Sequence, residues 1–179
     1  MFKSYFEDYY VMTQKQWKFL GGVMRTMKHR NLRFCFWGRL STCNNQLLSR
    51  LSGCVCRHYE NRYGLEICFR NIDGGLLLLH PFNITVNSRA ILGHNVTLFK
   101  GCTVGSVRSG KREGVPVIGN RVTLCVNSTV VGNVKIGDDV LVTANSMVDF
   151  DVPNHSVVIG NPGKIYYKEN ASKDYLTGI

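Results

Sequence analysis

The sequence predicts a mainly β protein: a parallel β-helix of hexapeptide repeats, preceded by a helical segment. The first observation is a six-residue period of aliphatic side chains, at Val86, Leu92, Leu98, Val104, Ile118, Leu124, Val130, Ile136, Val142 and Val148. The second is a small or β-branched residue four positions further on, at Ala90, Val96, Cys102, Val122, Ser128, Val134, Val140, Ser146 and Val152. A helix would space its apolar residues by about 3.6 positions. A hexad instead suits one short strand and a tight turn of a β-helix.

Residues 1–63 precede the repeats and are expected to form two or three helices. Breaks are predicted near Gly21-Gly22 and around Ser41–Asn45, where helix-breaking and turn-forming residues gather. Between residues 46 and 62 the apolar side chains recur at helical spacing, at Leu47, Leu48, Leu51, Cys54 and Val55. This stripe is expected to pack on the β-helix or on a partner subunit.

Residues 64–152 are assigned to the β-helix and 153–179 to a C-terminal cap or tail. Pro153 marks the exit, because proline has no N–H with which to extend a strand ladder. Gly93, Gly119 and Gly137 are expected to adopt turn conformations that a Cβ would strain. The interval from Val104 to Ile118 is 14 residues where two hexads would give 12. Its segment 105–114, GSVRSGKREG, has no apolar stripe and predicts a protruding functional loop.

Composition indicates one domain with an appendage. The chain has 179 residues, 44% of them hydrophobic, and no apolar run approaches the ~20 residues that cross a bilayer. Residues 1–10 lack the apolar core of a signal peptide. Seven cysteines show no metal-ligand spacing, which favours free thiols in a reducing cytoplasm and no metal site.

The net charge of +10 is concentrated in the helical segment. Residues 1–63 carry 11 Lys/Arg against 3 acids, whereas residues 64–179 carry 11 against 9. Attraction of nucleic acid, of an anionic membrane surface or of an anionic substrate would each fit this charge. No nucleic-acid motif is present, so nucleic acid is not expected as a partner. Peripheral contact with the inner face of a membrane through residues 1–63 remains open.

Ile72 and His80 lie eight residues apart, where regular hexads would give six, so His80 is interpreted as filling an aliphatic position at a broken register. This irregularity, the hexads and the segment IGNPGKI at 159–165 resemble the left-handed β-helix acyltransferases. The similarity is greatest to serine acetyltransferases and to O-acetyltransferases of surface-polysaccharide gene clusters, over about residues 64–167. It implies left-handed coils of three hexads, homotrimers, and active sites between neighbouring subunits.

The resemblance implies that His80 is the catalytic base, since an imidazole of pKa ~6.5 can accept a proton from an attacking alcohol near neutral pH. The family supports this histidine with a carboxylate one coil earlier, and Glu66 is the candidate, although the family generally has aspartate there. Asp73 is a second candidate, expected to face solvent. His94 is expected at the surface.

The resemblance also implies acetyl-CoA as co-substrate, bound along small turn residues. The matching positions are Asn127, Thr143 and Ala144, followed by Asn161, Pro162 and Lys164, with Lys164 the candidate phosphate partner. In the family's geometry the loop projects towards a neighbouring active site. Its cations Arg108, Lys111 and Arg112 would then lie near the acceptor or the CoA phosphates.

The acceptor is expected to be a sugar hydroxyl of a surface or capsular polysaccharide or its precursor. Serine acetyltransferases carry aspartate before the catalytic histidine and an Arg-His pair after the loop, where this chain has Leu79 and Gly114-Val115. Serine O-acetylation for cysteine biosynthesis is the alternative. A non-catalytic β-helix for assembly is another, which would not need His80 at a broken register. A γ-type carbonic anhydrase would need metal-binding histidines at spacings that this chain lacks.

Overall fold

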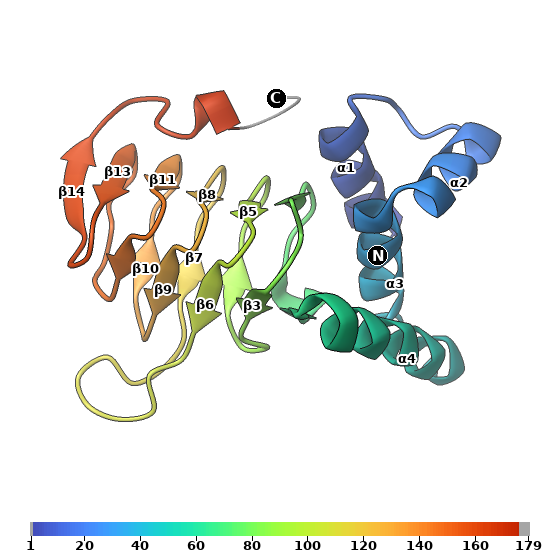
Figure 1. Cartoon of the computed structure of the whole chain (residues 1–179), viewed down its shortest axis with the longest axis horizontal. Coiled ribbons are helices and arrows are strands. Elements are labelled where there is room, and N and C mark those ends of the chain that lie inside the picture. The colour runs from blue at the N-terminus through green and yellow to red at the C-terminus, as the bar shows by residue number, and fades with distance from the viewer. Residues whose placement is uncertain (1, 176–179) are drawn as a thin grey trace.

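The computed structural model describes residues 2–175 and divides them between a helical bundle and a β-solenoid (Figure 1). The helices are α1 (Phe2–Thr13), α2 (Phe19–Lys28), α3 (Arg30–Leu40) and α4 (Gln46–Tyr63). Short 3₁₀ turns follow at Phe69–Asn71 and Lys173–Tyr175. No helix among these residues is long and apolar enough to span a membrane.

The solenoid has three sheets, which the chain visits in turn. Sheet A stacks β1 (Leu65–Ile67), β3 (Ile84–Val86), β6 (Thr103–Gly105), β9 (Thr129–Val131) and β12 (Met147–Val148). Sheet B stacks β4 (Ile91–Leu92), β7 (Val117–Ile118) and β10 (Lys135–Ile136). Sheet C stacks β2 (Leu77–Leu79), β5 (Thr97–Phe99), β8 (Thr123–Leu124), β11 (Val140–Val142), β13 (Ser156–Ile159) and β14 (Lys164–Tyr167). This architecture is consistent with a left-handed β-helix, and it continues through β13, beyond the expected exit at Pro153.

The hexad pattern correctly predicts the core of the solenoid. The ten aliphatic positions from Val86 to Val148 are at most 4% exposed, and equivalent residues align in neighbouring coils, as Val86, Val104, Val130 and Val148 do in sheet A. The nine small or β-branched positions are also buried. The alternating volumes therefore fill the interior of each coil.

The three glycines predicted at turns stack where sheet B turns into sheet C, but the reason for glycine there differs from the expected one. Gly93, Gly119 and Gly137 are absent from the residues with positive φ. A Cβ on Gly93 would instead lie 2.9 Å from the carbonyl oxygen of Gly119, and one on Gly119 would lie 2.9 Å from that of Gly137. Close approach between coils, rather than strained dihedral angles, therefore requires glycine here.

The helical segment contains four helices, so the prediction of two or three is wrong. Residues 21 and 22 lie inside α2, and Gly22 is needed there for packing, because a Cβ on it would be 2.6 Å from the Trp17 ring. The break at 41–45 is confirmed. The Asn45 side chain accepts a hydrogen bond from Leu48 N (3.1 Å) to cap α4, and Gly64, at φ +62°, ends it.

A buried ion pair attaches the bundle to the first coil. Arg39 Nε in α3 donates to the Asp8 carboxylate in α1 over 2.9 Å, and the same carboxylate accepts from Leu76 N over 2.8 Å. Arg39 also donates to the carbonyl oxygens of Ile72 and Asp73. Burial raises the pKa of Asp8 to about 6, although Arg39 and the backbone donors lower it.

The loop at 105–114 leaves the solenoid between β6 and β7 and projects from it (Figure 1). Fourteen residues separate the core positions Val104 and Ile118, where six separate the equivalent Val86 and Leu92. The insertion is therefore eight residues in a single side of one coil, and the interpretation of two extra residues in two hexads is wrong. Paired hydrogen bonds of 3.0 Å between Val107 and Gly114 close its base.

The C-terminal residues return across the outer face of sheet C (Figure 1). β14 pairs antiparallel with β13, the one antiparallel strand pair among the described residues. Beyond it, Ala171 packs in a small apolar cluster with Cys125, Leu141 and Val157. Asp139 secures this segment by accepting hydrogen bonds from Ala171 N (3.2 Å) and Ser172 N (3.1 Å).

Candidate active site

The candidate residues lie mostly along one edge of the solenoid, where strands of sheet C turn into strands of sheet A. We call this column of turns the C–A edge; its turns are residues 80–83, 100–102, 125–128 and 143–146. The hairpin turn at 160–163, which joins β13 to β14 within sheet C, stacks on the last of them. Successive turns are joined by backbone hydrogen bonds of 3.0–3.1 Å: Gly101 N to Phe82 O, Asn127 N to Lys100 O, Asn145 N to Val126 O, and Met147 N to Gly160 O. The edge is therefore a continuous ladder of exposed turns.

His80 occupies the first of these turns, and the two extra residues of the repeat lie there. Leu78 fills the core position and pairs with Leu98, while Val86 is the next core position. Eight residues thus separate Leu78 from Val86. The predicted excess is present, but it falls after Leu78 rather than before His80. The interpretation of His80 as filling an aliphatic position is wrong: its side chain lies outside the core.

The turn presents His80 to solvent in a conformation that is uncommon for a side-chain-bearing residue, with φ +52°. No hydrogen bond or ion pair of its imidazole is formed within residues 2–175. The backbone on either side is held by the start of α3: Asn31 Nδ2 donates to Leu78 O over 2.9 Å and Arg30 Nη2 to Pro81 O over 3.4 Å. The bundle therefore fixes the backbone of the turn and leaves the imidazole exposed.

The two candidate carboxylates lie elsewhere in the single chain. Glu66 is exposed on β1, where it pairs with Thr85 and lines an open depression of about 540 Å³ on sheet A. No hydrogen bond or ion pair joins it to His80 among the described residues. Asp73 lies 3.7 Å from His94 Nε2 at a different edge, in an exposed cluster with Glu7. Asp73 and His94 thus occupy the surface, as expected.

The structure brings the predicted CoA residues to the same edge as His80. Asn127, Thr143 and Ala144 belong to its turns, and Asn127 and Ala144 are exposed. Asn161 and Pro162 lie in the hairpin turn stacked on this edge, and Lys164 begins β14 directly after it. The column therefore presents backbone groups and small side chains in a line, with a cation at its far end.

Lys100 was not among the residues predicted from the sequence. It is an exposed cation in the turn of the next coil, beside that of His80. One coil of 18 residues before Lys100 is Phe82, which lies in the turn of His80. Counting the repeat in this way would have placed Lys100 beside that turn from the sequence alone. The neighbouring Cys125 is buried, and burial raises the pKa of its thiol to about 11. It therefore stays protonated near neutral pH and is no candidate nucleophile.

The loop cations lie at a different edge from His80 in the same chain, where sheet A turns into sheet B. Arg108 and Lys111 are exposed, whereas Arg112 is tied down: its Nη1 lies 3.4 Å from both Asn133 O and Asp151 Oδ1. A single chain does not bring these cations to His80.

Comparison with curated proteins finds serine acetyltransferases. The enzyme of Synechococcus elongatus is 33% identical over 159 residues, which cover 87% of this chain and 61% of the relative. Serine acetyltransferase 2 of Arabidopsis thaliana is 37% identical over 94 residues, covering 52% of this chain and 29% of that protein. The chain thus spans less than two thirds of the length of these relatives. No family model matches it.

Solved structures show the same fold. Soybean serine acetyltransferase complexed with serine superposes with a TM-score of 0.69 at 22% identity, covering 92% of this chain and 68% of that one. The Neisseria gonorrhoeae enzyme in complex with serine gives a TM-score of 0.64 at 23% identity, with coverage of 90% and 67%. These neighbours extend the similarity through most of the helical bundle as well as the solenoid.

Proposed function

Because the chain is a hexapeptide-repeat β-solenoid protein related to the serine acetyltransferases, we propose that it transfers the acetyl group of acetyl-CoA to a hydroxyl group. The observation that carries this proposal is the 33% identity to the Synechococcus elongatus serine acetyltransferase over 87% of the chain. The position of His80 in an irregular turn, on the edge that also holds the candidate CoA residues, supports it.

In this reaction His80 removes the proton of the acceptor hydroxyl as its oxygen attacks the thioester carbonyl carbon. The new ester C–O bond forms, the C–S bond breaks, and the proton passes through the imidazolium to the departing CoA thiolate. The Leu78 and Pro81 carbonyls that Asn31 and Arg30 hold would keep the imidazole in place. A carboxylate partner for the imidazole, Glu66 in this proposal, would stabilise the imidazolium.

Serine is the acceptor that the comparisons favour. The curated relatives cited above and the two solved neighbours are serine acetyltransferases. The expected polysaccharide acceptor has no support among them. A saccharide hydroxyl stays the second candidate because this chain has the uncharged residues Leu79 and Gly114-Val115 where serine acetyltransferases carry an aspartate and an Arg-His pair, which could hold serine's ammonium and carboxylate groups.

The test is release of CoA thiol from acetyl-CoA, with L-serine or a panel of free and nucleotide-linked sugars as acceptor. Mass spectrometry of the product distinguishes O-acetylserine from an acetylated sugar. Serine-dependent thiol release supports the proposal with serine as acceptor, and sugar-dependent release moves the acceptor to the second candidate. Release that no acceptor accelerates would refute acetyl transfer to either class.

A further inference from the structure

The apolar face of α2 has no partner within the described chain. Five of its side chains, Phe19, Leu20, Val23, Met24 and Met27, are between 42% and 77% exposed. At 100° per residue they share one arc of about 140° around the helix. The residues that α2 buries against the bundle, Gly22 and Thr26, lie outside this arc. The helix thus presents its apolar side to solvent.

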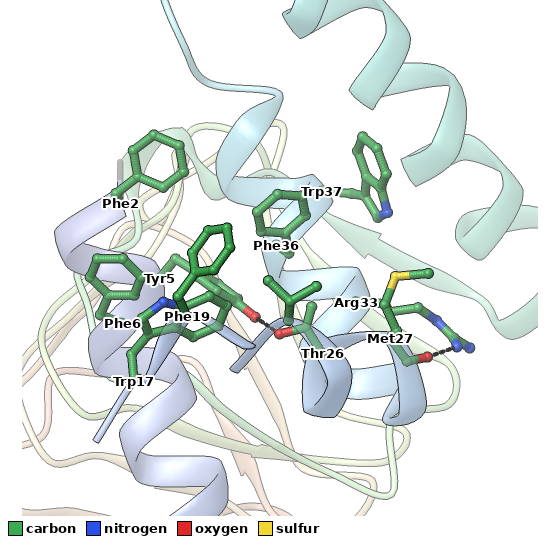
Figure 2. Close-up of a pocket in the computed structure, with 11 residues that line it drawn as sticks. Phe2, Tyr5, Phe6, Trp17, Phe19, Thr26, Met27, Arg33, Phe36 and Trp37 are labelled. Atoms are coloured by element: carbon green, nitrogen blue, oxygen red, sulfur yellow. Dashed lines mark hydrogen bonds between the residues drawn. The ribbon is translucent and has the colours of Figure 1, made fainter. Parts of the chain in front are cut away.

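An aromatic pocket continues this face into the bundle. It has a volume of about 510 Å³ and lies between α1, α2 and α3 (Figure 2). Figure 2 shows Phe2, Phe6, Phe19, Phe36 and Trp37 around it, and Arg33 hydrogen-bonded to the backbone of Met27. The Tyr5 hydroxyl is satisfied by Thr26 Oγ1 at 2.5 Å, so it offers no free polar group to the pocket. A connected apolar surface of this kind marks an interaction site.

Three exposed lysines lie on the elements that form this apolar surface. Lys18 precedes α2, Lys28 ends it, and Lys3 belongs to the exposed part of α1. The helical segment as a whole has 11 Lys/Arg against 3 acids. Asp8 and Arg39 are buried and paired with each other, so 10 Lys/Arg against 2 acids remain in the rest of this segment.

The charge decides what covers the face. A second copy of the chain would bring two positively charged surfaces together, whereas an anionic phospholipid surface complements them. Lysines beside an exposed apolar arc are typical of helices that lie in the plane of a bilayer interface. We propose that α2 and the adjoining aromatic pocket dock on an anionic phospholipid surface, with the apolar arc among the acyl chains and the lysines at the headgroup phosphates.

Sedimentation of the full chain with lipid vesicles tests this proposal. Vesicles of phosphatidylcholine with phosphatidylglycerol should carry the protein down, added salt should weaken binding, and phosphatidylcholine alone should bind little. The triple variant Phe19→Ser/Leu20→Ser/Met24→Ser should lower the partition coefficient by about tenfold or more. Its thermal unfolding should match that of the wild type, because the three side chains are exposed.

The matched control replaces another exposed apolar group, Leu47→Ser/Leu48→Ser/Leu51→Ser in α4, and should keep vesicle binding. Wild-type protein that stays in the supernatant with phosphatidylglycerol vesicles would overturn the proposal. So would equal binding by the α2 variant, or an equal loss in the α4 control. Light scattering in which the α2 variant alone loses a larger assembly would make a second copy the occupant.

Discussion

His80 lies in a turn that is two residues longer than the hexapeptide repeat requires. Leu78 completes the core of its coil and Val86 resumes it, so the chain between them bulges into an exposed turn. The next coil covers the same side in six residues, from Leu98 to Val104, so the turn that carries His80 is two residues longer. The irregularity thus creates the candidate base without disturbing the stack of aliphatic side chains.

Replacing His80 with alanine should reduce turnover of acetyl-CoA by roughly 100-fold or more, because the acceptor would lose its base. Thermal unfolding should barely change, since the side chain is exposed. Steady-state thiol release and circular dichroism measure the two effects. His94→Ala, at another exposed turn, is the control and should keep its turnover. Near-native turnover of folded His80→Ala would exclude this base.

Changing Glu66 to glutamine should have a smaller effect, on turnover more than on substrate affinity, if a neighbouring subunit or a bound substrate brings it to the imidazole. A changed pH–rate profile would reveal this role. A profile and a rate identical to those of the wild type would make Glu66 a solvent-exposed strand residue.

Arg39→Met should destabilise the protein by about 3–5 kcal/mol at neutral pH, because it leaves the Asp8 carboxylate buried without its cation. The pKa of Asp8 is raised to about 6, so the folded state binds its proton more tightly than the unfolded state. The stability from that proton is present at low pH and lost as pH rises through about 6. Urea unfolding should therefore show a smaller loss of stability in Arg39→Met below pH 6 than at neutral pH. A loss that does not depend on pH would contradict this prediction.

Among the elements, the loop at 105–114 is held where it leaves the solenoid by the hydrogen bonds between Val107 and Gly114, and it carries the exposed cations Arg108 and Lys111. Arg108→Ala/Lys111→Ala should raise KM several-fold for one substrate while the solenoid keeps its stability, because both side chains lie outside the core. KM measured separately for acetyl-CoA and for the acceptor assigns the loop to one of them. Unchanged values for both would leave it a tolerated insertion. Arg112→Ala should instead loosen the loop, because it breaks the contact with Asp151.

The C-terminal segment depends on Asp139. Burial raises the pKa of this carboxyl, but hydrogen bonds from Ser172, His155 and Ala171 outweigh it and hold the pKa below its usual value. Asp139→Ala should release the segment, and Cys125 beneath it should react faster with a maleimide. Peptide mass spectrometry locates the label. Because the pKa of Asp139 is lowered in the folded protein, the stability that its carboxylate contributes is lost as the pH falls through that pKa. Acid should therefore release the C-terminal segment of the wild-type protein. Equal labelling of Cys125 in both proteins would contradict this role.

The sequence predicts the repeating elements well because each hexad repeats one packing problem. It predicts exceptions less well. Four successive leucines at 76–79 allow the register to break on either side of Leu78, and only the pairing with Leu98 decides. Gly22 resembles a helix breaker until Trp17 packs on it. In α4 the stripe is helical as predicted, yet Leu47 stays 68% exposed, because packing depends on partners that periodicity does not specify.

At the scale of the whole molecule, one face of the solenoid is covered by the chain itself and another is exposed. Sheet C lies under the C-terminal segment, whereas on sheet B the paired residues Ile91 and Val117 are 49% and 39% exposed. We expect a homotrimer that covers such faces, with a mass about three times 20.2 kDa by light scattering. Ile91→Lys/Val117→Lys should dissociate it. A stable wild-type monomer at micromolar concentration would contradict this assembly and an active site shared between subunits.

The antiparallel pairing of β14 with β13 also limits how such a chain can lengthen in evolution. A stack of parallel coils has no intrinsic length, and its open strand edge can accept another strand from the same or another molecule. Here the reversed strand occupies that edge of sheet C, so a duplicated repeat added at the C-terminal end would find no parallel partner in this sheet. In sheet C, growth by whole coils is then open only inside the stack. Such an insertion would move Lys164 away from His80 and so lengthen the C–A edge along which we propose that acetyl-CoA binds.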